Sequence, residues 1–105
     1  MEEIIPKELK KKVGNEALEL ERNILNTRNG LSFVTKTCDL RSMFDMFGTL
    51  DSETDAFREH IGYLFGKGQI RGNEFMAICG NIEKFEDSTI HELIKLLREK
   101  CGCRL

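Results

Sequence analysis

The chain has 105 residues, of which 40% are hydrophobic and 32% are charged. This length is typical of one domain, and the composition excludes both an intrinsically disordered chain and an apolar membrane protein. The net charge of −2 comes from 16 basic and 18 acidic side chains that are interleaved along the sequence, which disfavours a general nucleic-acid binder. We therefore expect one domain over residues 1–105.

Cellular location is predicted from what the sequence lacks. No apolar run approaches the ~20 residues needed to span a bilayer. The first residues read MEEIIPK, without the basic and then apolar pattern of a secretory signal. The four cysteines are too sparse for a disulfide-stapled secreted scaffold. These observations predict a soluble, cytoplasmic chain whose cysteines are mostly reduced thiols.

A long amphipathic helix is predicted to begin at Pro6, because the fixed φ of proline suits a first helical turn. Its apolar stripe recurs at spacings of three and four and consists of Leu9, Val13, Ala17, Leu20 and Ile24. Asn29 and Gly30 favour a left-handed cap, so we expect the helix to end near Arg28. Gly14 is a weak point inside this helix, since glycine costs about 1 kcal/mol there relative to alanine, and a close contact with another helix is the alternative role for it.

Residues 31–36 alternate between two faces, as a strand does. One short strand would have no partner, so we predict an extended connector packed through Leu31 and Phe33. A short helix follows, capped by Thr37 or Asp39 and closed by Gly48. Its shared apolar face consists of Leu40, Met43, Phe44 and Phe47, whereas Met46 points off that face.

Three further helices are expected over residues 52–66, 73–85 and 89–101. The turn Gly66–Gly68 separates the first two, and Gly80 is a candidate break within the second. Thr89 with Glu92 matches a capping box, and Gly102 is a natural stop. The pattern predicts an all-α fold, a single compact bundle of about five short-to-medium amphipathic helices.

No constellation of residues predicts catalysis, so we expect a non-enzymatic protein without cofactor or metal. Cys101 and Cys103 offer two thiolates, but no cysteine pair has the two-residue gap of common zinc sites. Residues 57–78 resemble an EF-hand superficially. The positions that would need calcium-binding carboxylates hold Tyr63, Phe65 and Lys67, which excludes that site.

A candidate partner surface is predicted within residues 43–47. Four of these five positions carry large apolar side chains, which are Met43, Phe44, Met46 and Phe47. One helix face cannot bury all four completely, so part of the segment is expected to contact a protein partner or a second copy. Their complete burial by neighbouring helices stays open as an alternative. The favoured function is a protein-binding or regulatory module that docks through an apolar helical surface.

A nucleic-acid-binding regulator is the alternative function. It would use local clusters of basic side chains, namely Lys10, Lys11, Lys12, Lys67 and Arg71. This hypothesis requires that folding bring the two sequence segments together. The overall acidity of the chain makes nucleic acid the less favoured partner.

Overall fold

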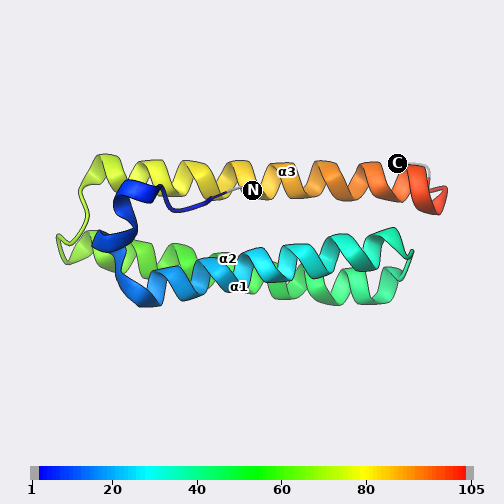
Figure 1. The fold of residues 1–105 in the computed structure, drawn as a ribbon, viewed down its shortest axis with the longest axis horizontal. Helices are drawn as coiled ribbons and strands as arrows, with labels where there is room; N and C mark the ends of the chain where they lie inside the picture. The colour runs from blue at the N-terminus through cyan, green and yellow to red at the C-terminus, as the bar shows by residue number, and fades with distance from the viewer. Residues whose placement is uncertain (1–2, 104–105) are drawn as a thin grey trace.

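The computed structural model describes residues 3–103 and shows an all-α bundle of long helices (Figure 1). The elements are a short 3-10 helix η1 (Lys7–Leu9), α1 (Lys10–Lys36), α2 (Leu40–Gly66) and α3 (Gly72–Cys101). Consecutive long helices run antiparallel, and the bundle measures 48 × 19 × 19 Å. The predicted all-α class is confirmed. The predicted division into about five helices is wrong, because the described residues contain three α-helices of 27, 27 and 30 residues besides η1.

Helix α1 continues through the predicted end at Asn29 and Gly30, so residues 31–36 are helical and the predicted connector is wrong. Leu31 and Thr35 are fully buried and extend the apolar stripe that passes through Ile24. Their burial outweighs the local preference of Asn29 and Gly30 for a cap. Gly30 has a packing role instead, since a Cβ placed on it would overlap Met46 of α2.

Helix α2 likewise passes through Gly48 without a break. Its buried residues recur at spacings of three, four or seven along the whole helix and are Met43, Leu50, Thr54, Phe57, Ile61 and Leu64. A stripe that stays on one face over this length specifies one helix, because a break would rotate the second half off the core. The exposed Gly48 only weakens the helix locally.

Helix α3 joins the two helices predicted over residues 73–85 and 89–101. Its stripe crosses the expected break and consists of Ile78, Ile82, Phe85, Thr89, Leu93 and Leu96. Thr89 is not a cap here, because its hydroxyl donates to the carbonyl oxygen of Phe85 at 2.8 Å. A threonine buried inside a helix satisfies its hydroxyl in this way without ending the helix.

The actual helix ends use several of the predicted signals. Asp39 caps α2 by accepting the backbone N–H of Ser42 at 3.1 Å, and Gly102 ends α3 with a left-handed φ of 67°. The turn at Gly66–Gly68 is also confirmed. The predicted start at Asn73 is slightly late, because α3 begins at Gly72 after the N-cap Arg71.

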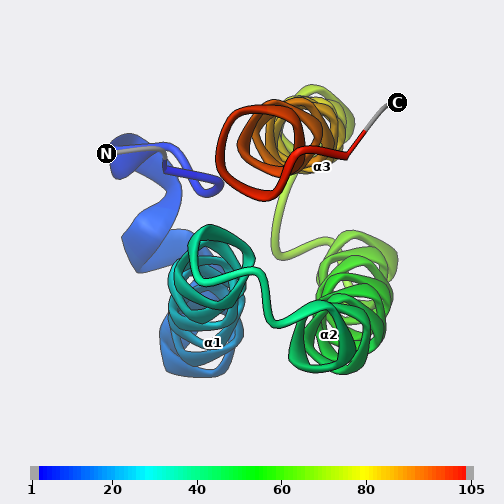
Figure 2. The ribbon, with the colours of Figure 1, turned by 90° about the vertical axis from the view of Figure 1, so that its right-hand side faces the viewer.

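The N-terminal segment folds back into the side between α1 and α3 (Figure 2). Ile4 and Ile5 are fully buried, and their backbone N–H groups donate to one carboxylate oxygen of Glu21 at 3.0 and 2.7 Å. Asn81 of α3 donates to the carbonyl oxygen of Ile4 at 2.9 Å. Gly14 takes φ 86° and ψ 175° and kinks α1, so the prediction of an unbroken helix from Pro6 is wrong at this point.

Candidate functional site

An apolar groove lies between the first half of α2 and the second half of α3, with a volume of about 250 Å³. Within residues 3–103, every side chain that lines it is apolar. The lining residues are Met43, Phe44 and Phe47 from α2, and Ile90, Leu93, Ile94 and Leu97 from α3. Because both walls are helical, their backbone groups are engaged within the helices and the groove presents side chains alone.

The groove has a buried floor and an exposed rim. Met43 and Leu93 are buried and belong to the floor. Phe44 is 69% exposed, Ile90 41% and Phe47 38%, so three large apolar side chains meet solvent around one depression. A contiguous apolar patch of this kind is typical of a surface that contacts another molecule.

A second hollow of about 300 Å³ continues the groove toward the middle of the molecule. It shares Phe47 and Ile90 with the apolar groove, and Leu50 and two threonines also line it. Its charged lining residues are all acidic, namely Asp51, Glu86 and Asp87. The combined depression therefore changes from wholly apolar at one end to acidic at the other.

Glu86 has a structural role within this acidic part. It forms an ion pair with Arg58 that bridges α3 and α2, and this hydrogen bond raises the pKa of the Arg58 guanidinium despite partial burial. Asp51 and Asp87 are exposed on opposite walls, and no ion pair within residues 3–103 neutralises either of them. The acidic end thus retains two carboxylates that face solvent.

The four predicted partner residues separate into two groups. Met43, Phe44 and Phe47 all line the apolar groove. Met46 is partly buried against the core and lies beside Gly30 of α1. Met46 points off the face that the other three residues share, as predicted, but α1 covers that side of α2, so Met46 does not line the groove.

The α3 wall is not apparent as a site from the sequence, because the spacing of Ile90, Leu93, Ile94 and Leu97 is typical of the buried face of a helix. The core uses Thr89, Leu93 and Leu96, whereas Ile90, Ile94 and Leu97 follow them one residue later in the sequence. This offset widens the apolar arc beyond the stripe that the core requires. The width of this apolar arc is the feature of the sequence that could have indicated a second apolar surface on α3.

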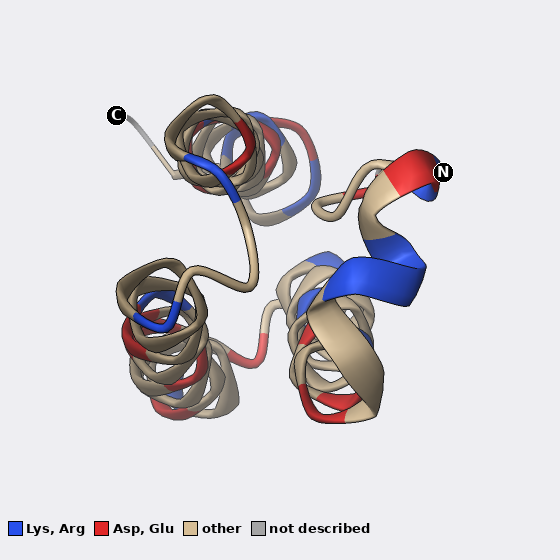
Figure 3. Ribbon diagram, turned by 90° about the vertical axis from the view of Figure 1, so that its left-hand side faces the viewer, with Lys and Arg blue, Asp and Glu red and all other residues tan. Residues whose placement is uncertain are grey.

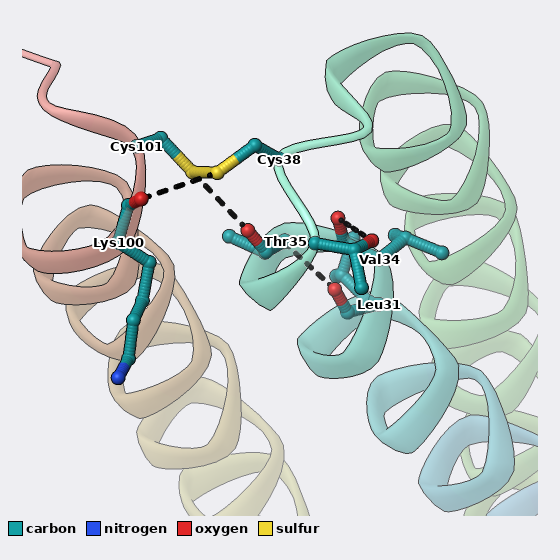
Figure 4. The surroundings of a disulfide bond; sticks show 7 residues. Leu31, Val34, Thr35, Cys38, Lys100 and Cys101 are labelled. Atoms are coloured by element: carbon teal, nitrogen blue, oxygen red, sulfur yellow. Dashed lines mark hydrogen bonds between the residues drawn. A yellow bond between two sulfur atoms is a disulfide. The ribbon is translucent and has the colours of Figure 1, made fainter.

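A disulfide joins Cys38 in the turn between α1 and α2 to Cys101 at the end of α3 (Figure 4). The prediction that the cysteines are mostly reduced is wrong for this pair, while Cys79 and Cys103 are free. Three antiparallel helices of similar length return the end of α3 to the α1–α2 turn, which brings together two cysteines 63 residues apart. The pairing depends on topology, which helical periodicity does not determine.

The other candidate chemistry has little support from the geometry. Among the described residues, no group of three or more His, Cys, Asp or Glu side chains is placed to hold a metal ion. Burial raises the pKa of the Cys79 thiol, so it is less nucleophilic than an exposed thiol at neutral pH. His60 has one ring nitrogen 3.9 Å from a carboxylate oxygen of Glu16, which is an ion pair only when the imidazole is protonated.

Both basic segments lie at the end of the bundle that carries η1 and the α2–α3 turn (Figure 3). Gln69 in that turn donates to the backbone carbonyl oxygen of Lys12 at 2.8 Å. Acidic side chains occupy the same end, however. Lys12 pairs with Glu74 at 2.8 Å and Lys10 with Glu3 at 3.4 Å, so part of the positive charge is neutralised.

None of the helices described in residues 3–103 has the length and apolar character required to cross a membrane. Comparison of the chain with protein-family models, with characterised proteins and with solved structures gives no match.

Proposed function

We propose that the chain is a non-enzymatic, protein-binding module whose docking surface is the groove between α2 and α3. The observation that supports this proposal most directly is the wholly apolar lining of the groove, with Phe44 69% exposed on its rim. Burying a large apolar side chain contributes about 1.5–3 kcal/mol, so covering Phe44, Phe47 and Ile90 provides a substantial driving force for association.

The test compares Phe44→Ser/Ile90→Ser with Phe33→Ser. Phe33 is a matched control, because it is 66% exposed but lies on α1 and does not line the groove. Wild-type and Phe33→Ser protein should capture the same partner from a lysate of the source cells, and Phe44→Ser/Ile90→Ser should lose it. Circular dichroism must show the same helicity for all three proteins. Equal capture by both variants would contradict the proposal.

Met46→Glu is unsuitable for this test, although Met46 is one of the four predicted partner residues. Met46 contacts the core and approaches Gly30, so a buried glutamate would destabilise the α1–α2 interface. Loss of binding in that variant would then report unfolding and would say nothing about the docking surface.

Nucleic-acid binding is a second candidate, and it is favoured by the hydrogen bond from Gln69 to Lys12, which links the α2–α3 turn to the first turn of α1. Glu3 and Glu74 oppose it, because each pairs with a lysine of the cluster. Binding through this cluster should weaken steeply as salt rises. It should also be lost in Lys11→Glu/Lys67→Glu and unaffected by Phe44→Ser.

A further inference from the structure

If the groove between α2 and α3 is the docking surface proposed above, its length, its walls and its charge restrict what can bind there. We infer that it binds an amphipathic α-helix of another protein, about three turns long, with apolar side chains along most of its buried face and lysine or arginine at one end. The two hollows share Phe47 and Ile90 and so lie next to each other along α2 and α3, as the two parts of the combined depression. Along α2 this depression extends from Met43 to Thr54, which at 1.5 Å per residue is roughly 17 Å, or three helical turns.

The secondary structure of the occupant follows from the walls. An extended peptide binds by strand addition where a sheet edge offers free backbone N–H and C=O groups. Both walls here are helices, and they offer no such edge. A helix whose apolar side chains recur at spacings of three and four fits a groove that presents only side chains.

The charge of the occupant follows from the gradient along the depression. The Phe44 end is lined by apolar residues alone, whereas Asp51 of α2 and Asp87 of α3 line the opposite end, and no basic side chain within residues 3–103 lines either hollow. A lysine or arginine could lay its aliphatic stem over Leu50 and Phe47 while its charged group reaches these carboxylates. An acidic residue at that end would be repelled.

The same gradient argues against a second copy of the chain as occupant. In a two-fold dimer the symmetry axis lies in the plane of the interface. An axis along the groove would place Asp51 and Asp87 opposite the same carboxylates of the other copy. An axis across the groove would place them opposite its apolar end, around Phe44. Both arrangements leave carboxylates without a cationic partner, which a basic-ended helix from another protein supplies.

The experiment selects binders from a displayed library of helical 14-residue peptides. Each peptide has apolar residues at positions i, i+3 and i+7 and random residues at both ends. The full chain is the target, and Phe47→Ser/Ile90→Ser protein is used for counter-selection. We expect the recovered peptides to be enriched in lysine or arginine at one end. In fluorescence anisotropy, Asp51→Asn/Asp87→Asn should weaken their binding about fivefold, as expected for two exposed ion pairs.

The matched control is Asp45→Asn/Glu83→Gln, which removes two exposed carboxylates from the same helices but from outside both hollows and should leave affinity unchanged. Peptides without a basic end that still require Phe47 and Ile90 would overturn the inferred charge while the docking function stands. Failure to recover any peptide that distinguishes wild type from the Phe47→Ser/Ile90→Ser protein would contradict the docking function itself. A wild-type dimer in sedimentation equilibrium that this variant dissociates would overturn the inferred occupant.

Discussion

Removing the Cys38–Cys101 disulfide should destabilise the chain strongly. The bond closes a loop across 63 positions of the sequence. The loop-entropy relation gives about 4 kcal/mol for a loop of this size, a large fraction of the ~5–15 kcal/mol that stabilises a typical domain. For a chain of this length, such a loss lowers the melting temperature by on the order of 15–20 °C.

The double variant Cys38→Ser/Cys101→Ser isolates this entropic effect. The sulfur of Cys38 lies 3.4 Å from the carbonyl oxygen of Lys100, and that of Cys101 lies 3.4 Å from the carbonyl oxygen of Thr35 (Figure 4). A thiol or serine hydroxyl at either position therefore has an acceptor close by. The expected loss comes from the greater freedom of the unfolded chain, since no polar group is stranded in the folded state.

Urea unfolding followed by circular dichroism measures the effect, with Cys103→Ser as the control that should behave like wild type. Excess dithiol reductant should reduce the wild-type bond to two thiols, while the reductant itself becomes a disulfide. Reduction should lower the stability of wild type to that of the double variant and leave the double variant unchanged. Alkylation in urea should label Cys79 and Cys103 before reduction and all four cysteines afterwards. Equal stability of oxidised and reduced wild type would refute the loop-entropy reasoning, and four labelled cysteines before reduction would refute the bond.

Three further predictions test the rest of the structure. Gly14→Ala should destabilise the chain by about 1–3 kcal/mol in urea unfolding, because φ there is +86°. Gly48→Ala is the control, since Gly48 is helical with open space around it, and this change should stabilise the chain by about 0.5–1 kcal/mol. Equal effects of the two substitutions would contradict the kink at Gly14. Glu21→Ala should cost about 3 kcal/mol, since two buried N–H groups of the N-terminal segment lose their acceptor, and unchanged hydrogen exchange of Ile4 and Ile5 would contradict this role. Burial raises the pKa of the Cys79 thiol, so a smaller fraction of Cys79 is thiolate at pH 8. Iodoacetamide should therefore alkylate Cys79 more slowly than Cys103 in the folded chain. This difference in rate should disappear in urea.

The sequence predicted which residues are helical better than where helices end. Apolar spacing correctly indicated most of the buried stripes, including Val13, Ala17 and Ile24. Gly48 and Thr89 resemble helix ends locally, yet both lie inside continuous helices. Long-range burial decides between one helix and two, and it is settled by neighbours that are distant in the sequence.

Of the two walls of the candidate groove, only the α2 wall was predictable from the sequence, because exposure depends on neighbours that are distant in the sequence. Met43, Phe44 and Phe47 stood out because large apolar side chains crowd one short segment. Which of them stays exposed depends on where the other helices lie, as Met46 shows by packing beside α1. The disulfide pairing could not be predicted from the sequence. Four cysteines permit three pairings when all are bonded, and in this chain only one pair is bonded.

The opening between α2 and α3 has a physical cause in the polar contacts of α3. On the side that faces α1, Arg28 donates to Thr89 at 3.1 Å and to Glu92 at 2.6 Å. These contacts hold that part of α3 beside α1. On the side that faces α2, the same stretch presents Ile90, which lines the groove and is 41% exposed.

The two ends of the depression are fixed independently of these contacts. The Arg58–Glu86 ion pair joins α2 to α3 beside the acidic end, and the disulfide ties the last residue of α3 to the α1–α2 turn. Closing the groove by collapse would require α3 to leave Arg28 and to move relative to both fixed points. Filling it from outside requires none of these changes, so an added helix gains apolar burial without disrupting the bundle.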